Sequence, residues 1–511
     1  MNRFRPLLRS LLLPTLSGVL YFLSWIGFGI WPLAFVCLLP LLWSLREATP
    51  LQALKLGAWM GFVTHLGGYT WIMHLLSVFA FAPLPLAFGG YLLVCAAQGL
   101  LFGVFSMVLR WAWIRAPRWP LVALVPVALV ATEAVYPLLF QSYTGVALMP
   151  LVPLIQIADL GGVLLLTALQ ALVNGALADL FIRRSRSAAW PLAAAALALV
   201  ASTTYGLVRL RSVHQQEQAA PHLRVGLAQP NVGEIELHQN PYLSVRTLWE
   251  QTAELHVRGA ELVVWPEVGY NVKPVYPAAD GRVIQGGVPV PLIAGVERVT
   301  GSQGGEEQIY NSAIAIDARG NIGDHFDKIE LLAFGEYIPG GEWFPQIYQW
   351  SPLASHLSRG QTTKPLRAAG FRFATFICYE DILPKLVRKT MQNYYPEGRA
   401  DAMVNLTNDS WYGSGFEQEE HLMLAAVRTI EHRRWLLRAT STGYSAFVDA
   451  SGRVVQRIGR NQRGVAVHDV PMLQGTTLYE LFGDWPGWVS LAALALIGVR
   501  AWMAARKQAR T

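Results

Sequence analysis

The sequence predicts a polytopic α-helical membrane region of eight spans joined to one external α/β domain. Hydrophobic residues make up 53% of the 511 residues and charged residues only 15%, which is not the balance of an ordinary soluble protein. The apolar residues concentrate in 7–208 and again in 485–505. Between these ranges, short apolar runs alternate with segments of helical spacing, as in an α/β domain. The predicted divisions are a membrane region at 1–210, an external domain at 211–484 with its core at about 223–470, and a last membrane helix with a basic tail at 485–511.

Eight apolar segments are long enough to cross a bilayer, whose hydrocarbon core takes about 20 apolar residues per helix. They lie near 10–25, 29–45, 56–80, 86–109, 120–138, 160–181, 189–208 and 486–504. The first segment has arginines on its N-terminal side, as a signal peptide would. The stretch LSGVLYFLSW has no clear small-residue cleavage site, however, and another apolar segment follows at once, so we expect the first segment to remain in the protein.

Basic residues occur on alternate connections between these segments. The N-terminus and the second, fourth and sixth connections contain Lys or Arg, whereas the first, third and fifth contain none. Arg506, Lys507 and Arg510 follow the last segment. Because short cytoplasmic loops retain basic residues, both termini are predicted to be cytoplasmic and the large domain external. These arginines also account for much of the net charge of +7, which therefore does not indicate nucleic-acid binding.

The sequence has three cysteines, too few for a disulfide framework and without the spacing of a metal site. Cys37 and Cys95 fall in predicted membrane helices, where a small apolar role is expected. Cys378 belongs to the external domain and follows the buried strand pattern FRFATFI. The pattern alone fits an inert core thiol, whereas an unpaired cysteine in an oxidising compartment favours a functional one.

Strand and helix patterns follow one another along the external domain. Strands are predicted at 223–231, 261–269, 290–299, 371–381 and 400–410, hairpins at 309–329 and 443–458, and helices at 240–259, 381–393 and 417–435. The first hairpin turns at Ala318-Arg319-Gly320. Strands that alternate with helices predict layers of helix and sheet.

Three chemically reactive side chains stand at or just after strand ends in this domain: Glu267, Lys328 and Cys378. Open α/β sheets gather their sites at the carboxyl ends of strands, so these residues could converge. A thiolate attacks a carbonyl carbon, a carboxylate accepts the thiol proton, and an ammonium stabilises the oxyanion that forms. A fixed cation would also lower the pKa of the thiol. Spacing alone leaves open a core cysteine, a helix N-terminal acid and a solvated lysine.

Four motifs in this order resemble the carbon–nitrogen hydrolase, or nitrilase, superfamily: VVWPE at 263–267, DKIELLAFGEYIP at 327–339, ICYED at 377–381 and NLTNDSWYG at 405–413. With seven apolar segments before this domain and one after it, the whole chain resembles the apolipoprotein N-acyltransferase family. The resemblance implies an αββα sandwich with a Glu-Lys-Cys triad. It makes Glu267 the general base, Lys328 the cation that stabilises the oxyanion and Cys378 the nucleophile.

The same motifs imply further residues that shape the site. The matching positions are Glu336 in FGEYIP, Asn311 in YNS, Tyr379 and Glu380 after the nucleophile, Asn408 in TND and Trp411 in the SWYG loop. One segment departs from the family pattern, which often has Ile-Pro-Gln and then a Trp soon after the first strand. This chain has Val232-Gly233 there and His238 near the Trp position, which puts lipid contacts by this loop in doubt.

The resemblance implies a two-step acyl transfer. Cys378 would take a fatty acyl chain from a membrane phospholipid as a thioester, and the α-amino group of a diacylglyceryl-cysteine lipoprotein would then attack that thioester. The implied partners are these two substrates and the bilayer, with no cofactor and no metal ion, and a monomer is expected. The family also implies the bacterial inner membrane, with the catalytic domain on the periplasmic side.

Two other functions stay open. A membrane-tethered nitrilase or amidase would use the same triad with water as the acceptor, and a transporter or scaffold would need no triad. The segment 340–360, with Trp343 and Phe344, is the candidate gating loop and lipid contact, and 79–90 is a candidate entry for the acyl chain. Five ionisable residues lie in or near the predicted spans, where such groups are either functional or hydrogen-bonded between helices: Glu133, Asp159, Asp179, His65 and His74.

Overall fold

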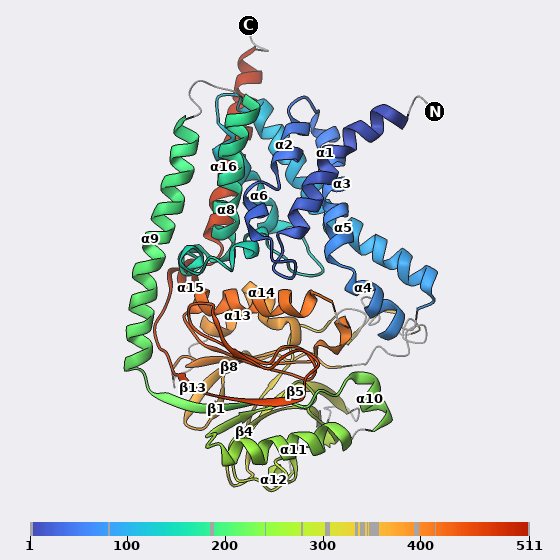
Figure 1. The fold of residues 1–511 in the computed structure, drawn as a ribbon, viewed down its shortest axis with the longest axis vertical. Helices are drawn as coiled ribbons and strands as arrows, with labels where there is room; N and C mark the ends of the chain where they lie inside the picture. Colours follow the sequence, from blue (N-terminus) through green and yellow to red (C-terminus); the bar gives the residue numbers. More distant parts are fainter. Residues whose placement is uncertain are drawn as a thin grey trace.

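The computed structural model describes residues 4–508 apart from 80–81, 184–188, 241, 277–278, 302–306, 333–335, 338–342, 345, 347–356, 393–397 and 414. A bundle of helices stands on a domain of two β-sheets (Figure 1). The N-terminal end of α1 (Phe4–Leu23) and the C-terminal end of α16 (Trp485–Gln508) both point away from the sheets. The two ends of the described chain therefore lie on the same side of the bundle.

Each of the eight predicted segments overlaps a helix. Besides α1 and α16, the helices are η1 (Trp31–Phe35), α2 (Leu39–Leu45), α3 (Pro50–Gly68), α4 (Trp71–His74), η2 (Leu75–Phe79), α5 (Leu84–Arg115), α6 (Leu121–Val135), η3 (Thr144–Leu148), α7 (Val152–Ile155), α8 (Ala158–Ala178), η4 (Asp179–Arg183) and α9 (Ala189–Ala219). Among the described residues, four stretches are long and apolar enough to cross a membrane: Leu84–Arg115, Ala158–Ile182, Ala189–Ala219 and Trp485–Gln508. Three further apolar helices are shorter, so eight crossings stay a prediction.

Glycines bring α3 and α5 into close contact. A Cβ added to Gly61 would collide with the carbonyl oxygen of Gly99, and one added to Gly57 would collide with that of Phe102. Small residues of this kind let membrane helices pack backbone to backbone. The glycine face of α3 therefore determines which side of α3 meets α5.

The α/β domain contains two sheets. The first has the strand order β13-β1-β2-β4-β5-β6, with β3 paired to β4, and the second has the order β12-β11-β10-β9-β8-β7. The strands of the first sheet are β1 (His222–Gln229), β2 (Leu262–Val264), β3 (Tyr270–Val275), β4 (Leu292–Thr300), β5 (Gln308–Ile316), β6 (Ile322–Asp327) and β13 (Gly464–Pro471). Those of the second are β7 (Leu366–Ala368), β8 (Phe371–Ile377), β9 (Ala402–Thr407), β10 (Leu436–Thr440), β11 (Ala446–Val448) and β12 (Val454–Arg457).

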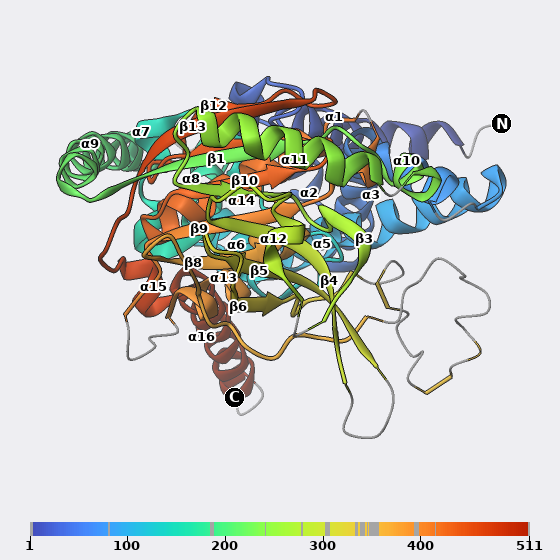
Figure 2. The same ribbon diagram turned by 90° about the horizontal axis from the view of Figure 1, so that it is seen from below.

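Helices cover the outer faces of the two sheets. The sheets share one buried apolar cluster, to which Val264 and Ala313 come from the first and Phe373 and Val404 from the second. α11 (Tyr242–Val257) and α12 (Gly281–Ile284) cover the face of the first sheet that is remote from the bundle (Figure 2). α13 (Pro384–Gln392) and α14 (Glu417–His432) lie between the second sheet and the bundle (Figure 1). The predicted α/β domain is confirmed.

Some boundaries differ from the prediction. The helix predicted at 417–435 ends at His432, because Arg433 adopts a left-handed backbone with φ 51°. β10 begins after three intervening residues and is not among the predicted strands; β3, β7 and β13 are not among them either. α9 continues past residue 210 to Ala219 and carries the chain down the side of the bundle to β1 (Figure 1).

Ionisable residues in the bundle have hydrogen-bond partners in neighbouring segments. Glu133 accepts from the N–H of Thr144 at 2.9 Å and from the hydroxyl of Thr167 at 2.7 Å. Asp179 accepts from the first two N–H groups of α6 at 2.9 and 2.8 Å. His65 Nδ1 lies 2.7 Å from the carbonyl oxygen one turn earlier in α3. These contacts support the structural interpretation of the three residues.

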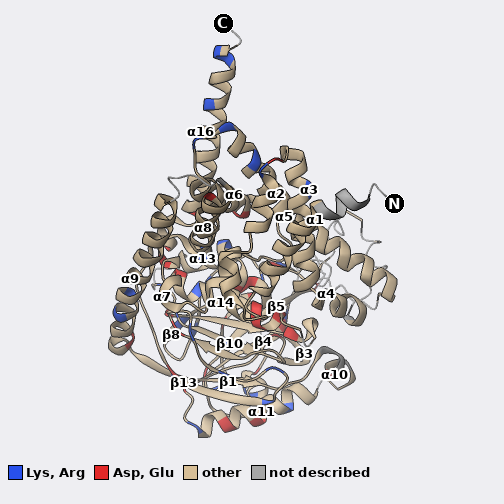
Figure 3. Cartoon of the chain, turned by 45° about the horizontal axis from the view of Figure 1, so that its top comes forward, with Lys and Arg blue, Asp and Glu red and all other residues tan. Residues whose placement is uncertain are grey.

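Figure 3 shows few charged residues along the bundle helices and basic residues at the free end of α16.

A buried ion pair joins the bundle to the α/β domain. Asp159 at the start of α8 lies 2.7 Å from Arg433, which follows α14, and 2.8 Å from Arg209 on α9. His74 lies against Gly413, where an added Cβ would come within 2.8 Å of the imidazole. Asp159 and His74 therefore both belong to contacts between the bundle and the α/β domain.

Candidate active site

Glu267 lies just after β2, and groups from both sheets hold its carboxylate. The side chain is only 7% exposed. Oε1 accepts hydrogen bonds from Asn311 Nδ2 at 2.7 Å and from Lys328 Nζ at 3.2 Å. Oε2 accepts from the backbone N–H of Asn408, after β9, at 2.9 Å. These three donors fix the carboxylate in one orientation.

Lys328 follows β6 directly and is 1% exposed, so its ammonium is removed from water. Nζ donates to Oε1 of Glu267 at 3.2 Å and to Oε1 of Glu336 at 2.8 Å. Asn311 Nδ2 bridges the same two carboxylates, at 2.7 and 3.1 Å. A buried ammonium is stable only with such partners. The structure thus brings together four of the predicted site residues, two of them acids that share one cation.

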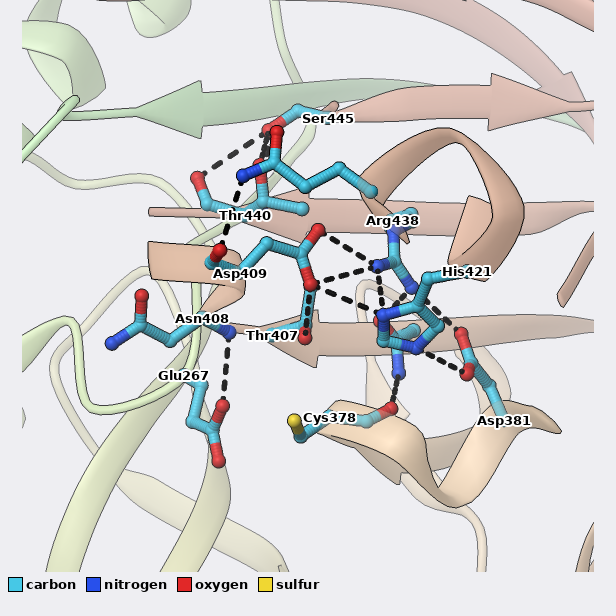
Figure 4. A network of polar contacts seen from close by, with 12 residues as sticks. Glu267, Cys378, Asp381, Thr407, Asn408, Asp409, His421, Arg438, Thr440 and Ser445 are labelled. Carbon is cyan, nitrogen blue, oxygen red and sulfur yellow. Dashed lines mark hydrogen bonds and ion pairs between the residues drawn. The ribbon is translucent and has the colours of Figure 1, made fainter. Parts of the chain in front are cut away.

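Cys378 is the first residue of the 3₁₀ turn η6 (Cys378–Ile382), which begins where β8 ends. Its side chain is 4% exposed and its backbone is left-handed, with φ 55°. This conformation costs a residue other than glycine about 1–2 kcal/mol. Figure 4 shows the Cys378 thiol and the Glu267 carboxylate on the same side of the turn. Strain of this kind gathers at functional sites and is not needed for an inert core thiol.

The thiol of Cys378 is protonated in the resting site. Burial raises its pKa, Glu267 raises it further, and Lys328 lowers it without cancelling these effects. The expectation of a lowered thiol pKa is therefore wrong: Lys328 does act in that direction, but removal from water and a nearby carboxylate outweigh it. Burial also raises the pKa of Glu267 against the opposing effect of Lys328. For Lys328, burial lowers the pKa, but Glu267 and Glu336 outweigh it and raise the value. Such a thiol needs a base to become a nucleophile.

Glu380 ties the nucleophile turn to the segment of the lysine. Oε2 accepts from the N–H of Ile377 at 2.8 Å, and Oε1 accepts from the N–H groups of Ile329 and the residue after it, at 2.7 and 2.9 Å. Burial raises the pKa of Glu380 to about 7, although these backbone donors lower it. The ring of Tyr379 lies 5.9 Å from Nζ of Lys328. Tyr379 and Glu380 therefore both lie close to Lys328 or its segment.

Two family models together match most of the chain. The apolipoprotein N-acyltransferase N-terminal domain matches residues 17–176, and carbon-nitrogen hydrolase matches 224–477. The apolipoprotein N-acyltransferase of Azotobacter vinelandii is 32% identical over 98% of this chain and 95% of its own length. The chain belongs to the apolipoprotein N-acyltransferase family. The enzyme of that name from Pseudomonas syringae pv. tomato is 29% identical over 94% of this chain and 96% of its own length.

Solved structures similar to this apolipoprotein N-acyltransferase family member include amidases. An amidase from Nesterenkonia sp. matches with 20% identity and a TM-score of 0.37, over 52% of this chain and 97% of the amidase. A mutant of the Nesterenkonia AN1 amidase, from the nitrilase superfamily, matches with 18% identity and a TM-score of 0.36, over 52% of this chain and 94% of that one.

The remaining predicted residues of this family member lie toward the bundle or on the exposed surface. Trp411 packs against the apolar cluster of the bundle helices. Trp343 is 81% exposed and Phe344 is 63% exposed, while most of the predicted gating loop around them lies outside the described residues. Val232-Gly233 leads into the short helix α10 (Glu234–Gln239), and the side chain of His238 lies outside the described residues.

The sequence prediction missed a polar group directly behind Cys378. Asn405 donates to the carbonyl oxygen of Cys378 at 2.9 Å and accepts from Arg438 Nη1 at 2.9 Å. Asn405 is the first residue of the NLTND motif and lies on a buried strand. Arg438 lies on β10, which was not predicted, so the contact between the two residues could not be predicted either. The one available signal was the arginine inside the apolar run WLLRAT, because arginine is seldom fully buried unless it is paired.

Proposed function

We propose that the chain is an N-acyltransferase of lipoprotein maturation that moves a fatty acyl chain from a membrane phospholipid, through a thioester on Cys378, to the α-amino group of a diacylglyceryl-cysteine lipoprotein. Family membership supports the overall reaction, because relatives matched over nearly the full chain carry the name apolipoprotein N-acyltransferase. The observation that carries the mechanism is the buried Glu267 carboxylate, which Lys328, Asn311 and Asn408 orient beside the Cys378 turn.

In the first step, the Cys378 thiol gives its proton to Glu267 as the sulfur attacks the ester carbonyl carbon of the phospholipid. A C–S bond forms, and the carbonyl oxygen becomes an oxyanion that Lys328 stabilises. When the oxyanion collapses, the C–O bond to the glycerol breaks and Glu267 returns the proton to the leaving alkoxide. The products are the acyl thioester and a lysophospholipid.

In the second step, the α-amino group of the lipoprotein attacks the thioester carbonyl carbon and gives a proton to Glu267. A C–N bond forms through a second oxyanion at Lys328. The C–S bond then breaks, and the proton on Glu267 returns to the sulfur of Cys378. The thioester conserves the energy of the acyl bond, so neither step requires ATP.

The proposed setting is the inner membrane of a bacterium. The chain crosses it eight times, with residues 1–210 and 485–511 in or beside the membrane, both termini cytoplasmic, and the catalytic domain at 211–484 periplasmic. The protein works as a monomer on two substrates anchored in the same bilayer. Basic residues on alternate connections support this orientation.

Trp343 and Phe344 are the proposed lipid contacts. Both aromatic side chains are largely exposed, at 81% and 63%, as an apolar surface meant for lipid would be. Replacing both with alanine should raise the KM for phospholipid in vesicles without changing thioester formation at saturation. The matched control is Tyr242→Ala, because Tyr242 is 62% exposed on α11, at the face remote from the bundle. An unchanged KM in the double variant would remove this part of the proposal.

The test of the reaction follows the acyl chain. The purified full-length protein is incubated with phospholipid labelled in its acyl chain and a synthetic diacylglyceryl-cysteine peptide. We expect label on the peptide as an amide that hydroxylamine does not cleave, and none with Cys378→Ala. Labelled free fatty acid beside an unlabelled peptide would indicate a hydrolase that uses water as the acceptor. A transporter or scaffold would give neither product.

A further inference from the structure

Behind the Cys378 turn lies a buried group of charged side chains that the mechanism does not use (Figure 4). The group, here called the Arg438 cluster, consists of Arg438, Asp381, Asp409 and His421, and none of these is more than 1% exposed. Charges removed from water are costly unless each is paired. A cluster of this kind beside a nucleophile therefore needs an explanation.

Arg438 determines which way the amide of Asn405 points. Cys378 directly follows β8, and Asn405 and Arg438 lie on the neighbouring strands β9 and β10, with Asn405 paired to Phe376 and Arg438 paired to Asn405. Nη1 of Arg438 donates to Oδ1 of Asn405 at 2.9 Å, and this leaves Nδ2 to donate to the carbonyl oxygen of Cys378 at 2.9 Å. A flipped amide would place two acceptors together and two donors together. Arg438 thereby secures the hydrogen bond that holds the strained Cys378 backbone.

The two aspartates extend the same contact to the nucleophile turn and to the general base. Nη1 of Arg438 donates to Asp381 at 2.9 Å, and Asp381 is part of the η6 turn that begins at Cys378. Nη2 donates to Asp409 at 3.1 Å. The residue before Asp409 is Asn408, whose backbone N–H donates to Oε2 of Glu267. One guanidinium thus links both segments that carry the reacting groups.

His421, from α14, joins the two aspartates from the other side. Its Nε2 lies 3.2 Å from Asp381 and its Nδ1 lies 3.1 Å from Asp409. Burial and Arg438 lower the pKa of His421, but the two aspartates outweigh them and raise it. Nδ1 of His421 also lies 3.0 Å from Nη2 of Arg438, so the imidazole contacts all three other members of the cluster. His421 thereby ties both aspartates and the guanidinium to α14.

We propose that Arg438 is a positioning residue of the acyl transfer: through Asn405, Asp381 and Asp409 it fixes the Cys378 thiol and the Glu267 carboxylate in the relative positions that proton transfer requires. The inference rests on the proposed function of Cys378 and Glu267. Arg438 touches no substrate in this role. Without the cluster, the strained Cys378 backbone relaxes toward an ordinary conformation and moves the thiol away from its base.

The test compares Arg438→Lys and Asn405→Asp with the wild type, as full-length proteins in detergent. Lysine keeps the charge but lacks the fork that reaches three partners. Aspartate at 405 keeps the shape and the pairing with Arg438 but turns an acceptor toward the Cys378 carbonyl. Both variants should alkylate Cys378 with iodoacetamide about 10- to 100-fold more slowly across the pH range, as expected for a misplaced reacting group. Thioester formation from phospholipid should slow equally, with an unchanged KM.

Arg434→Lys is the matched control. Arg434 is also fully buried, but it precedes β10 and donates to the carbonyls of Ala400 and Gly475. This variant should lose stability in thermal unfolding yet keep wild-type rates per folded molecule. Wild-type rates in Arg438→Lys and Asn405→Asp, corrected for the folded fraction, would overturn the proposal, as would an equal loss in the control. If the wild type forms no thioester while alkylation differs as described, the proposed function fails and the positioning role stands.

Discussion

The Glu267 side chain gives a direct test of the proposed base. Glu267→Gln keeps the size of the side chain and one acceptor oxygen for Lys328 and Asn311 but cannot accept a proton. We expect single-turnover thioester formation on Cys378, followed by mass spectrometry, to fall about 100- to 10,000-fold, the usual contribution of a positioned base. Glu254→Gln, on the exposed face of α11, serves as the control and should react at the wild-type rate. A similar rate in both variants would rule out Glu267 as the base.

Acid should stop the reaction at a pH above the ordinary range of a glutamate. Burial raises the pKa of Glu267, and only the ionised form accepts the thiol proton, so the acylation rate should fall as the pH drops through that raised value. Glu336 raises the pKa of Glu267 as well, so Glu336→Gln should move the fall to lower pH. Single-turnover rates against pH test this, with Glu330→Gln, a half-exposed neighbour, as the control. A fall that stays in place or moves to higher pH in Glu336→Gln contradicts the assignment.

Motifs could place Glu267, Lys328, Glu336 and Cys378 in one site, because each stands in a recognisable run of sequence. They could not give the protonation state of the thiol. That depends on how completely the folded site removes Cys378 from water, and burial outweighs Lys328 there. Arg438 escaped prediction for a similar reason, since its contacts join three strands that are far apart in the sequence.

The ion pair between α8 and the end of α14 should be essential for docking the catalytic domain on the bundle. Asp159 and Arg433 are both at least 95% buried, so Arg433→Ala leaves a buried carboxylate with only the partly exposed Arg209 as its cation. We expect the free energy of unfolding in denaturant to fall by about 3 kcal/mol. The control, Arg457→Ala, breaks a more exposed pair with Glu419 and should cost at most about 1 kcal/mol. Equal losses would show that the pair does not hold the two parts together.

Element types were easier to predict than element ends. Short apolar runs indicated β1, β4, β5, β8 and β9, and the structure has a strand at each of these places. β10 was missed because it follows α14 with only three residues between, so its apolar run WLLRAT looked like the end of a helix. The second predicted span divides into η1 and α2, because Pro32 and Pro40 each start a new helical segment.

The proposed orientation of the chain in the membrane rests on its basic connections and can be measured. Single cysteines replace Arg118, in the fourth connection, or Thr476, beyond β13, in a background with Cys37 and Cys95 changed to alanine; both positions are exposed. In cells with a permeabilised outer membrane, an impermeant maleimide should label Thr476→Cys at once and Arg118→Cys only after lysis. The buried Cys378 should react little in either case. Labelling in the reverse order would place the catalytic domain in the cytoplasm.

The complete molecule brings a protonated thiol, a bound carboxylate and a buried ammonium together beneath a helical bundle, and its central claim is that Cys378 carries the acyl chain. Intact-mass spectrometry of the full-length protein after exposure to phospholipid, without a lipoprotein acceptor, tests this most directly. We predict a mass gain of one fatty acyl group that maps to Cys378, is removed by neutral hydroxylamine, and is absent from Cys378→Ala. An unchanged mass in a protein that still acylates the lipopeptide, or an acyl group at another residue, would contradict it.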